Sequence, residues 1–195
     1  MNTQRQKLQP MHVLLLSIVV LLAPFTAQAS RDHAPSEALQ ARGTFRHIYA
    51  MFFKLYDVTL YTDAAPQATP AEMLNGQHTL RLEFSYLRTI KKEIILESGE
   101  KMLQRNLSPS EFASIEDRVA QLNAAYTTVR RGDQSALSYK QGHGTSLEIN
   151  GRPIITIPGD DFAPLYFRIW LGDQPISSEM RDYLIDPRNS KTNKT

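Results

Sequence analysis

Residues 43–61 read GTFRHIYAMFFKLYDVTLY, and this stretch does most to decide the fold. It is rich in aromatic and β-branched residues, which favour extended structure. Apolar residues occupy both alternating sets of positions, a pattern typical of a strand that is buried on both faces. We therefore expect one long, buried strand here.

The pattern switches between strand and helix downstream of this stretch. Residues 80–86 alternate strictly between apolar and polar, as in a half-buried strand. Near residue 89 the apolar spacing becomes that of a helix ending near Leu107. Residues 108–111, Ser-Pro-Ser-Glu, then have the form of a capping box with proline at the first helical position. A second helix is expected from there to Arg131.

Further strands and helices are expected in the last third of the chain. Apolar residues alternate in three short stretches, 137–139, 147–149 and 155–157. Asn150-Gly151 between the last two is a strong hairpin signal. A helix with an aromatic stripe should begin at Asp160 or Asp161 and end at Gly172, followed by a short helix over about residues 177–185. Strands on both sides of a helical pair predict an α+β fold with an antiparallel sheet covered by helices on one face.

The N-terminal residues 1–29 have the features of a cleavable signal peptide. Arg5 and Lys7 precede an apolar run at 13–23, and Ala27-Gln28-Ala29 supplies small residues for cleavage after Ala29. The apolar run spans about 16 Å as a helix, well below the roughly 30 Å of a bilayer core. We expect an exported chain without a permanent membrane anchor; the alternative is an uncleaved anchor.

Composition limits the partners of the exported chain. Two of the 22 basic residues and none of the 20 acidic ones fall within residues 1–29, which leaves 20 of each sign. A neutral chain lacks the electrostatic signature of nucleic-acid binding. The chain has no cysteine, so an exported domain must be stabilised by core packing alone. We expect a flexible lead-in at 30–42, one domain at 43–186 and a disordered tail at 187–195.

Several strings, in this order and spacing, resemble the chalcone isomerase-like family in its bacterial exported branch. The matching segments are 52–61 (FFKLYDVTLY), 106–108 (NLS), 131–133 (RGD), 147–151 (LEING), 157–159 (IPG) and 168–173 (RIWLGD). The resemblance implies an open-faced β-sandwich with a ligand cleft between the sheet and its helices. It also implies a periplasmic location. Plant members close the ring of a chalcone, whereas other relatives bind fatty acids through an arginine and a tyrosine.

Chalcone isomerase activity is not expected from the residues at the matching positions. Ring closure needs a cation beside the ketone and polar groups around the attacking phenolate. In the enzymes of the family these groups are an arginine, a threonine, a tyrosine and an asparagine. Tyr56, Thr89 and Leu96 stand where the last three would be.

A binding site is the leading hypothesis, with Arg46, Tyr56 and Arg88 as ligand-binding residues. Tyr56 matches the tyrosine of the fatty-acid-binding relatives. Arg42 and Arg46 both lie at an even separation from it, and Arg46 has the more apolar setting. Arg88 would lie at the mouth of the cleft. The alternative is that none of the three binds a ligand: Arg46 and Arg88 are then solvated surface charges, and Tyr56 belongs to the core.

We therefore expect a periplasmic, non-catalytic binder of a small apolar or fatty-acid-like ligand. Two alternatives stay open: an isomerase acting on an unsaturated carbonyl compound through Arg46 and Tyr56, and a scaffold protein whose cleft is filled by its own side chains. No cofactor is expected. The histidines of the exported part are scattered without the spacing of a metal site, although a lone haem ligand stays conceivable; they are His33, His47, His78 and His143.

Overall fold

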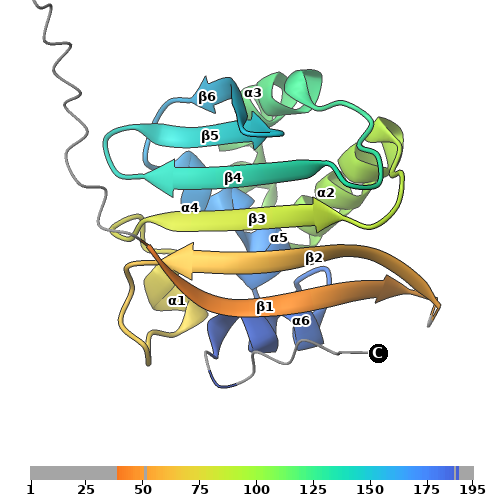
Figure 1. The fold of residues 1–195 in the computed structure, drawn as a ribbon. Helices are drawn as coiled ribbons and strands as arrows, with labels where there is room; N and C mark the ends of the chain where they lie inside the picture. The colour runs from red at the N-terminus through yellow and green to blue at the C-terminus, as the bar shows by residue number, and fades with distance from the viewer. Residues whose placement is uncertain (1–38, 51, 187, 189–195) are drawn as a thin grey trace, which may run out of the picture. The chain divides into compact units, whose positions relative to one another are not determined.

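The protein contains one six-stranded antiparallel sheet whose strands follow each other in chain order (Figure 1). The structure is a computed structural model that describes residues 39–50, 52–186 and 188. The strands are β1 (Gln40–Tyr49), β2 (Phe53–Thr62), β3 (Leu80–Tyr86), β4 (Gln134–Lys140), β5 (Gly144–Ile149) and β6 (Arg152–Ile157). The expected signal peptide lies outside the described residues, as does the tail apart from Arg188.

Six helices accompany the sheet, and Figure 1 shows them gathered behind it. They are α1 (Pro70–Met73), α2 (Lys92–Asn106), α3 (Pro109–Ala125), α4 (Phe162–Tyr166), α5 (Arg168–Leu171) and α6 (Ser178–Ile185). We call the covered face of the sheet the inner face and the opposite one the outer face. The expected α+β architecture, a sheet covered by helices on one face, is confirmed. Within the described part of the chain no helix has the length and apolarity needed to cross a membrane.

The stretch at 43–61 forms two strands, so the expectation of one long strand is wrong. The chain reverses between β1 and β2, where Ala50 has a φ of 48°. The apolar pattern was misleading for two reasons. The reversal changes which sequence positions face the core, and Tyr49 and Phe52 at the turn are apolar although they are exposed. β1 also begins at Gln40, so residues 40–42 of the expected lead-in belong to the sheet.

Burial alternates along the strands and defines the core. Val58 and Leu60 of β2 are completely buried, and so are Leu80 and Leu82 of β3, which occupy every second position. Their neighbours in the sequence lie on the outer face and are polar. Because the helices cover just one face, the hydrophobic core lies between that face and the helical layer.

The helical pair α2 and α3 follows the predicted pattern with one difference. The Ser108 hydroxyl accepts from Glu111 N at 3.3 Å, and Ser108 N donates to Glu111 Oε2 at 2.8 Å, which confirms the capping box. α3 ends at Ala125 instead of near Arg131. The chain turns extended at Tyr126 because Val129 then pairs with Ile90 in an antiparallel bridge.

The closing helical segment also differs from the expectation of one helix. It forms α4 and α5, with Phe167 between them. Asp161 precedes α4 without a capping hydrogen bond from its side chain. Its carboxylate instead accepts from both terminal nitrogens of Arg118, at 2.8 and 2.6 Å. This ion pair ties α3 to the start of α4.

Candidate functional site

Arg42, one of the two arginines considered for a ligand, is occupied by the protein itself. It is the extra residue of a bulge in β1, between the pairs Ala41–Tyr61 and Gly43–Leu60. The residue is 6% exposed, and its guanidinium donates to four backbone carbonyls: Ile185 O at 2.8 Å, Ala64 O at 3.3 Å, Ala65 O at 2.8 Å and Pro66 O. Burial lowers the pKa of Arg42. The side chain joins the end of α6 to the loop after β2, and its donors are used there.

Arg46 lies on the outer face of the sheet. It stands opposite Asp57 on β2 and donates from Nε and Nη2 to the two carboxylate oxygens, at 2.6 and 2.8 Å. This bidentate bond to Asp57 raises the pKa of Arg46. Tyr56, the neighbour of Asp57 on the same strand, points to the inner face. The expectation that Arg46 and Tyr56 share one face is therefore wrong, because the chain reverses between them and the even spacing loses its meaning.

Tyr56 lies within a row of aromatic side chains on the inner face. Its ring stacks on His47 at 5.1 Å and meets Phe84 edge-on at 5.4 Å. Phe84 in turn contacts Trp170 of α5 at 5.6 Å, and Trp170 contacts Tyr166 at 6.1 Å. We call these residues, with Phe162 beside Tyr166, the aromatic row. Side chains thus occupy the layer between sheet and helices where the ligand cleft was expected.

The hydroxyl of Tyr56 differs from those of the other buried tyrosines. Tyr86 Oη lies 2.9 Å from Ser135 Oγ, and Tyr139 Oη donates to Gly76 O at 2.6 Å. Tyr56 is 8% exposed, and its hydroxyl has no hydrogen-bond partner among the residues that the structure describes. The hydroxyl keeps contact with solvent, because Thr145 Oγ1 is the one fully buried, unpartnered side-chain oxygen or nitrogen in the described part of the chain. Burial raises its pKa, so the phenol is neutral and has one donor to offer.

A hollow of about 160 Å³ opens beside the aromatic row, between the edge strand β1 and α6. Four residues of β1 and three of the α6 region line it: Phe45, Arg46, His47, Ile48, Ser177, Glu179 and Tyr183. His47 belongs to both the hollow and the row, so it connects the surface to Tyr56. Burial lowers the pKa of His47, which keeps the ring neutral near pH 7.

A second hollow, of about 110 Å³, lies on the outer face over β3, β4 and β5. Its charged residues satisfy one another. Arg81 donates to Glu83 Oε1 at 2.8 Å and to Glu148 Oε2 at 3.1 Å. Because its charged groups are paired with one another, this hollow offers a ligand no free charge.

Arg88 lies away from both hollows. It is exposed, and its guanidinium carbon lies 4.9 Å from the ring centre of Phe53 at the end of the sheet. The structure thus does not bring Arg46, Tyr56 and Arg88 together, and a ligand role for each stays a prediction. Among the described residues, no group of three or more histidine and carboxylate side chains is placed to hold a metal ion.

Sequence reasoning missed the α6 side of the hollow and the part played by His47. Its position next to Arg46 does place it on the opposite strand face, toward the core. Nothing local marks Ser177, Glu179 and Tyr183, since they meet β1 through tertiary packing alone.

A single antiparallel sheet covered by helices on one face is the architecture of an open-faced β-sandwich. Residues 35–186 match the family model described as chalcone isomerase-like, and the chain belongs to that family. Among solved structures, the fatty-acid binding protein AtFAP1 of Arabidopsis thaliana is similar in fold, with a TM-score of 0.58. The two share 11% identity over 79% of this chain and 89% of that one. No curated protein sequence matches the chain significantly.

Proposed function

We propose that the protein is a non-catalytic binding protein for a small apolar ligand that carries one hydrogen-bond acceptor. The observation that carries this proposal is the unpartnered hydroxyl of Tyr56 inside the aromatic row. Because this hydroxyl keeps contact with solvent, an acceptor on a ligand would replace water there, which contributes about 0.5–1.5 kcal/mol. The fold shared with a fatty-acid binding protein supports the same interpretation.

The size of the hollow favours a compact ligand. An apolar cavity of about 150 Å³ holds benzene, whereas drug-sized ligands occupy roughly 300–1,000 Å³. The hollow beside His47 has about 160 Å³. The ligand class is therefore a ring or a short acyl chain, and a long fatty acid would have to displace α6 or part of the aromatic row.

The charges around the row favour a neutral polar group over a carboxylate. Arg42 is saturated by carbonyls, and Arg46 is bound to Asp57 on the outer face. His47 is neutral near pH 7 because burial lowers its pKa. Arg46 also lines the hollow, but its charge is already paired with Asp57, and Glu179 adds a negative charge to the same lining. A carboxylate would therefore lose hydration for little gain, which is costly. A ketone, aldehyde or ester oxygen is neutral, so one hydrogen bond from the hydroxyl of Tyr56 would be sufficient for it.

The isomerase alternative has less support. It requires a cation beside the phenol to stabilise an enolate, and Arg46 was its candidate. The register of β1 and β2 puts Arg46 opposite Asp57 and Tyr56 opposite His47. The two groups therefore face opposite sides of the sheet.

Export to the periplasm, with cleavage after Ala29, belongs to the same proposal. It is supported by the basic start, the apolar run and the Ala-Gln-Ala site of residues 1–29. Fractionation of the host with mass measurement of the protein would test it. A periplasmic chain that begins at Ser30 is expected, and a cytoplasmic chain of full length would refute it.

Ligand binding is tested with a series of neutral and acidic probes, followed by the fluorescence of Trp170, the single tryptophan and a member of the aromatic row. Cyclohexanone and hexanal should quench or shift the emission at pH 7, and hexadecanoate should act weakly or not at all. Tyr56→Phe should weaken binding about two- to twelvefold, the value of one hydrogen bond. Tyr61→Phe, on the outer face of the same strand, is the matched control. Equal binding by both variants, or tight binding of hexadecanoate alone, would refute the proposal.

A further inference from the structure

Exposed apolar side chains gather at one end of the sheet. Six large apolar residues are exposed in the described part of the chain, and four of them lie where β1 turns into β2: Ile48 at 39%, Tyr49 at 64%, Phe52 at 76% and Phe53 at 44%. A fifth, Ile94, lies in the first turn of α2, which follows β3 at the same end. Single exposed apolar residues are ordinary, but a cluster of this kind marks an interaction surface.

This end of the hairpin also extends beyond the rest of the sheet. The pairing of β2 with β3 stops at Tyr56 and Tyr86, followed by one bond from Leu87 N to Leu55 O at 2.8 Å. Past that point β1 and β2 pair with each other, as Figure 1 shows. Two strands alone are marginally stable in water, so an overhanging turn with two exposed phenylalanines gains from an apolar surrounding. We call residues 48–50 with 52–54 the hairpin tip.

Positive charge collects around the hairpin tip. Because neighbouring strands are antiparallel, the turns at 49–54, 87–93, 126–133 and 150–152 share one end of the sheet. Their exposed cations are Lys54, Arg88, Lys91, Arg130, Arg131 and Arg152. The same turns carry two carboxylates, Glu93 and Asp133, and Asp133 already accepts from Arg130 N at 2.7 Å and from Asn150 at 3.1 Å.

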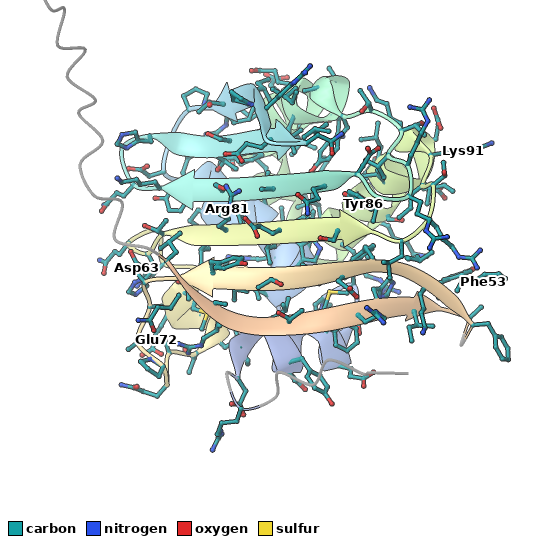
Figure 2. The ribbon with its side chains drawn as sticks, viewed as in Figure 1. Phe53, Asp63, Glu72, Arg81, Tyr86 and Lys91 are labelled. Atoms are coloured by element: carbon teal, nitrogen blue, oxygen red, sulfur yellow. The ribbon has the colours of Figure 1, made fainter. Side chains whose placement is uncertain are left out.

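The opposite end of the sheet has the opposite charge. Its turns carry the carboxylates of Asp63, Glu72, Asp160 and Asp161, of which Asp161 is paired with Arg118, and Lys140 adds one positive charge. Figure 2 shows the separation, with Phe53 and Lys91 at one end and Asp63 and Glu72 at the other. The whole chain has a formal charge of just +2, so the basic end reflects how the fold distributes its charges.

We propose that the hairpin tip docks on an anionic lipid surface, with Tyr49, Phe52 and Phe53 inserted at the headgroup level and the six cations over the headgroups. Aromatic side chains favour the membrane interface, and basic clusters are attracted to anionic lipids. A projecting turn with aromatic residues at its apex enters a fluid interface without a preformed pocket. Of the tip residues, Ile48 also lines the hollow beside His47, whereas Tyr49, Phe52 and Phe53 do not. The proposed insertion of these three aromatic side chains is therefore independent of the ligand beside Tyr56.

Co-sedimentation with vesicles tests this proposal. The probes are vesicles of phosphatidylcholine alone and vesicles with one part phosphatidylglycerol to two parts phosphatidylcholine. The protein should bind the anionic vesicles, and added salt should weaken the binding. Lys91→Glu changes the charge by two units and should lower the partition coefficient more than fivefold, since each unit near an anionic surface is worth about that factor. Phe52→Ser should lower it about fivefold or more because it removes an aromatic ring from the interface. Both side chains are exposed, so neither change should affect folding.

Two matched variants separate the tip from general effects. Ile154→Ser removes an exposed apolar residue of β6, roughly 24 Å from β1 at about 4.8 Å per strand. Lys140→Glu reverses an exposed charge at the acidic end. Both should bind within about twofold of the parent protein. Absence of binding to anionic vesicles, or equal losses in the control variants, would overturn the proposal. So would a dimer in solution that Phe52→Ser dissociates, because the tip would then be a protein interface.

Discussion

Replacing Arg42 by methionine should destabilise the protein far more than the same change at Arg46. The methionine retains most of the apolar stem and removes the guanidinium. The substitution removes the guanidinium donors from the carbonyls of Ala64, Ala65, Pro66 and Ile185. Of these, Ala65 O keeps a hydrogen bond from Ala68 N at 2.8 Å. Two of the lost bonds are 2.8 Å long. At about 1.5–3 kcal/mol for a hydrogen bond to a charged group, the two together contribute about 3–6 kcal/mol.

Arg46→Met is the matched comparison. Its partner is a carboxylate, but the two side chains are 30% and 29% exposed. Ion pairs with that much solvent contact contribute about 0–1 kcal/mol. Arg42→Met should therefore lower the free energy of unfolding by several kcal/mol more than Arg46→Met, although the two arginines lie four residues apart on the same strand.

Urea denaturation followed by the fluorescence of Trp170 measures both changes. Since domains of this size unfold with about 5–15 kcal/mol, the Arg42 variant should lose a large part of its stability. Arg42→Lys should fall between the two, because an ammonium group cannot reach all four carbonyls in one plane. A loss below about 1 kcal/mol for Arg42→Met would refute the structural role of this side chain.

Four further predictions concern the pH dependence, the helix cap and the packing of the domain. Burial lowers the pKa of His47 from 6.5, so the unfolded chain takes up a proton at a higher pH than the folded protein does. The free energy of unfolding should therefore fall as the pH drops below 6.5. Urea denaturation of His47→Phe at several pH values should show a flatter profile in this range. Hydrogen bonds from Ser108 lower the pKa of Glu111 below its ordinary 4.5, so the stabilisation is present above pH 4.5 and is lost as the pH falls through the folded value; Glu111→Gln should remove that loss in acid denaturation. Ser108→Ala should cost about 1 kcal/mol of unfolding free energy at pH 7. Gly43→Ala should cost about 1–3 kcal/mol in thermal unfolding, because a Cβ would overlap the carbonyl oxygen of Tyr183 and push α6 away from β1; a variant as stable as the parent would contradict this.

The order of elements was predictable because each signal is local. The capping box at Ser108 and the hairpin dipeptide at Asn150-Gly151 act within a few residues, and both are observed. The reversal between β1 and β2 was not predictable, since the exposed aromatics of the hairpin tip continue the apolar pattern of the buried strands. These side chains are exposed and do not belong to the core.

The candidate site was predictable only in part. Tyr56 lies on the inner face of the sheet, within the layer where a cleft was expected. Arg46, the expected partner of Tyr56, lies on the outer face instead. The strand register decides which face each arginine occupies, and a turn and two irregularities in β1 set this register. The four carbonyls around Arg42 come from segments up to 143 residues away, a contact that no local pattern reveals.

A crystal structure of the protein saturated with cyclohexanone tests the ligand site most directly. Density for the ring should fill the hollow beside His47, with the ketone oxygen about 2.5–3.0 Å from Tyr56 Oη. Density elsewhere, or an unchanged hollow with Tyr56 Oη still unpartnered, would contradict the proposed binding function.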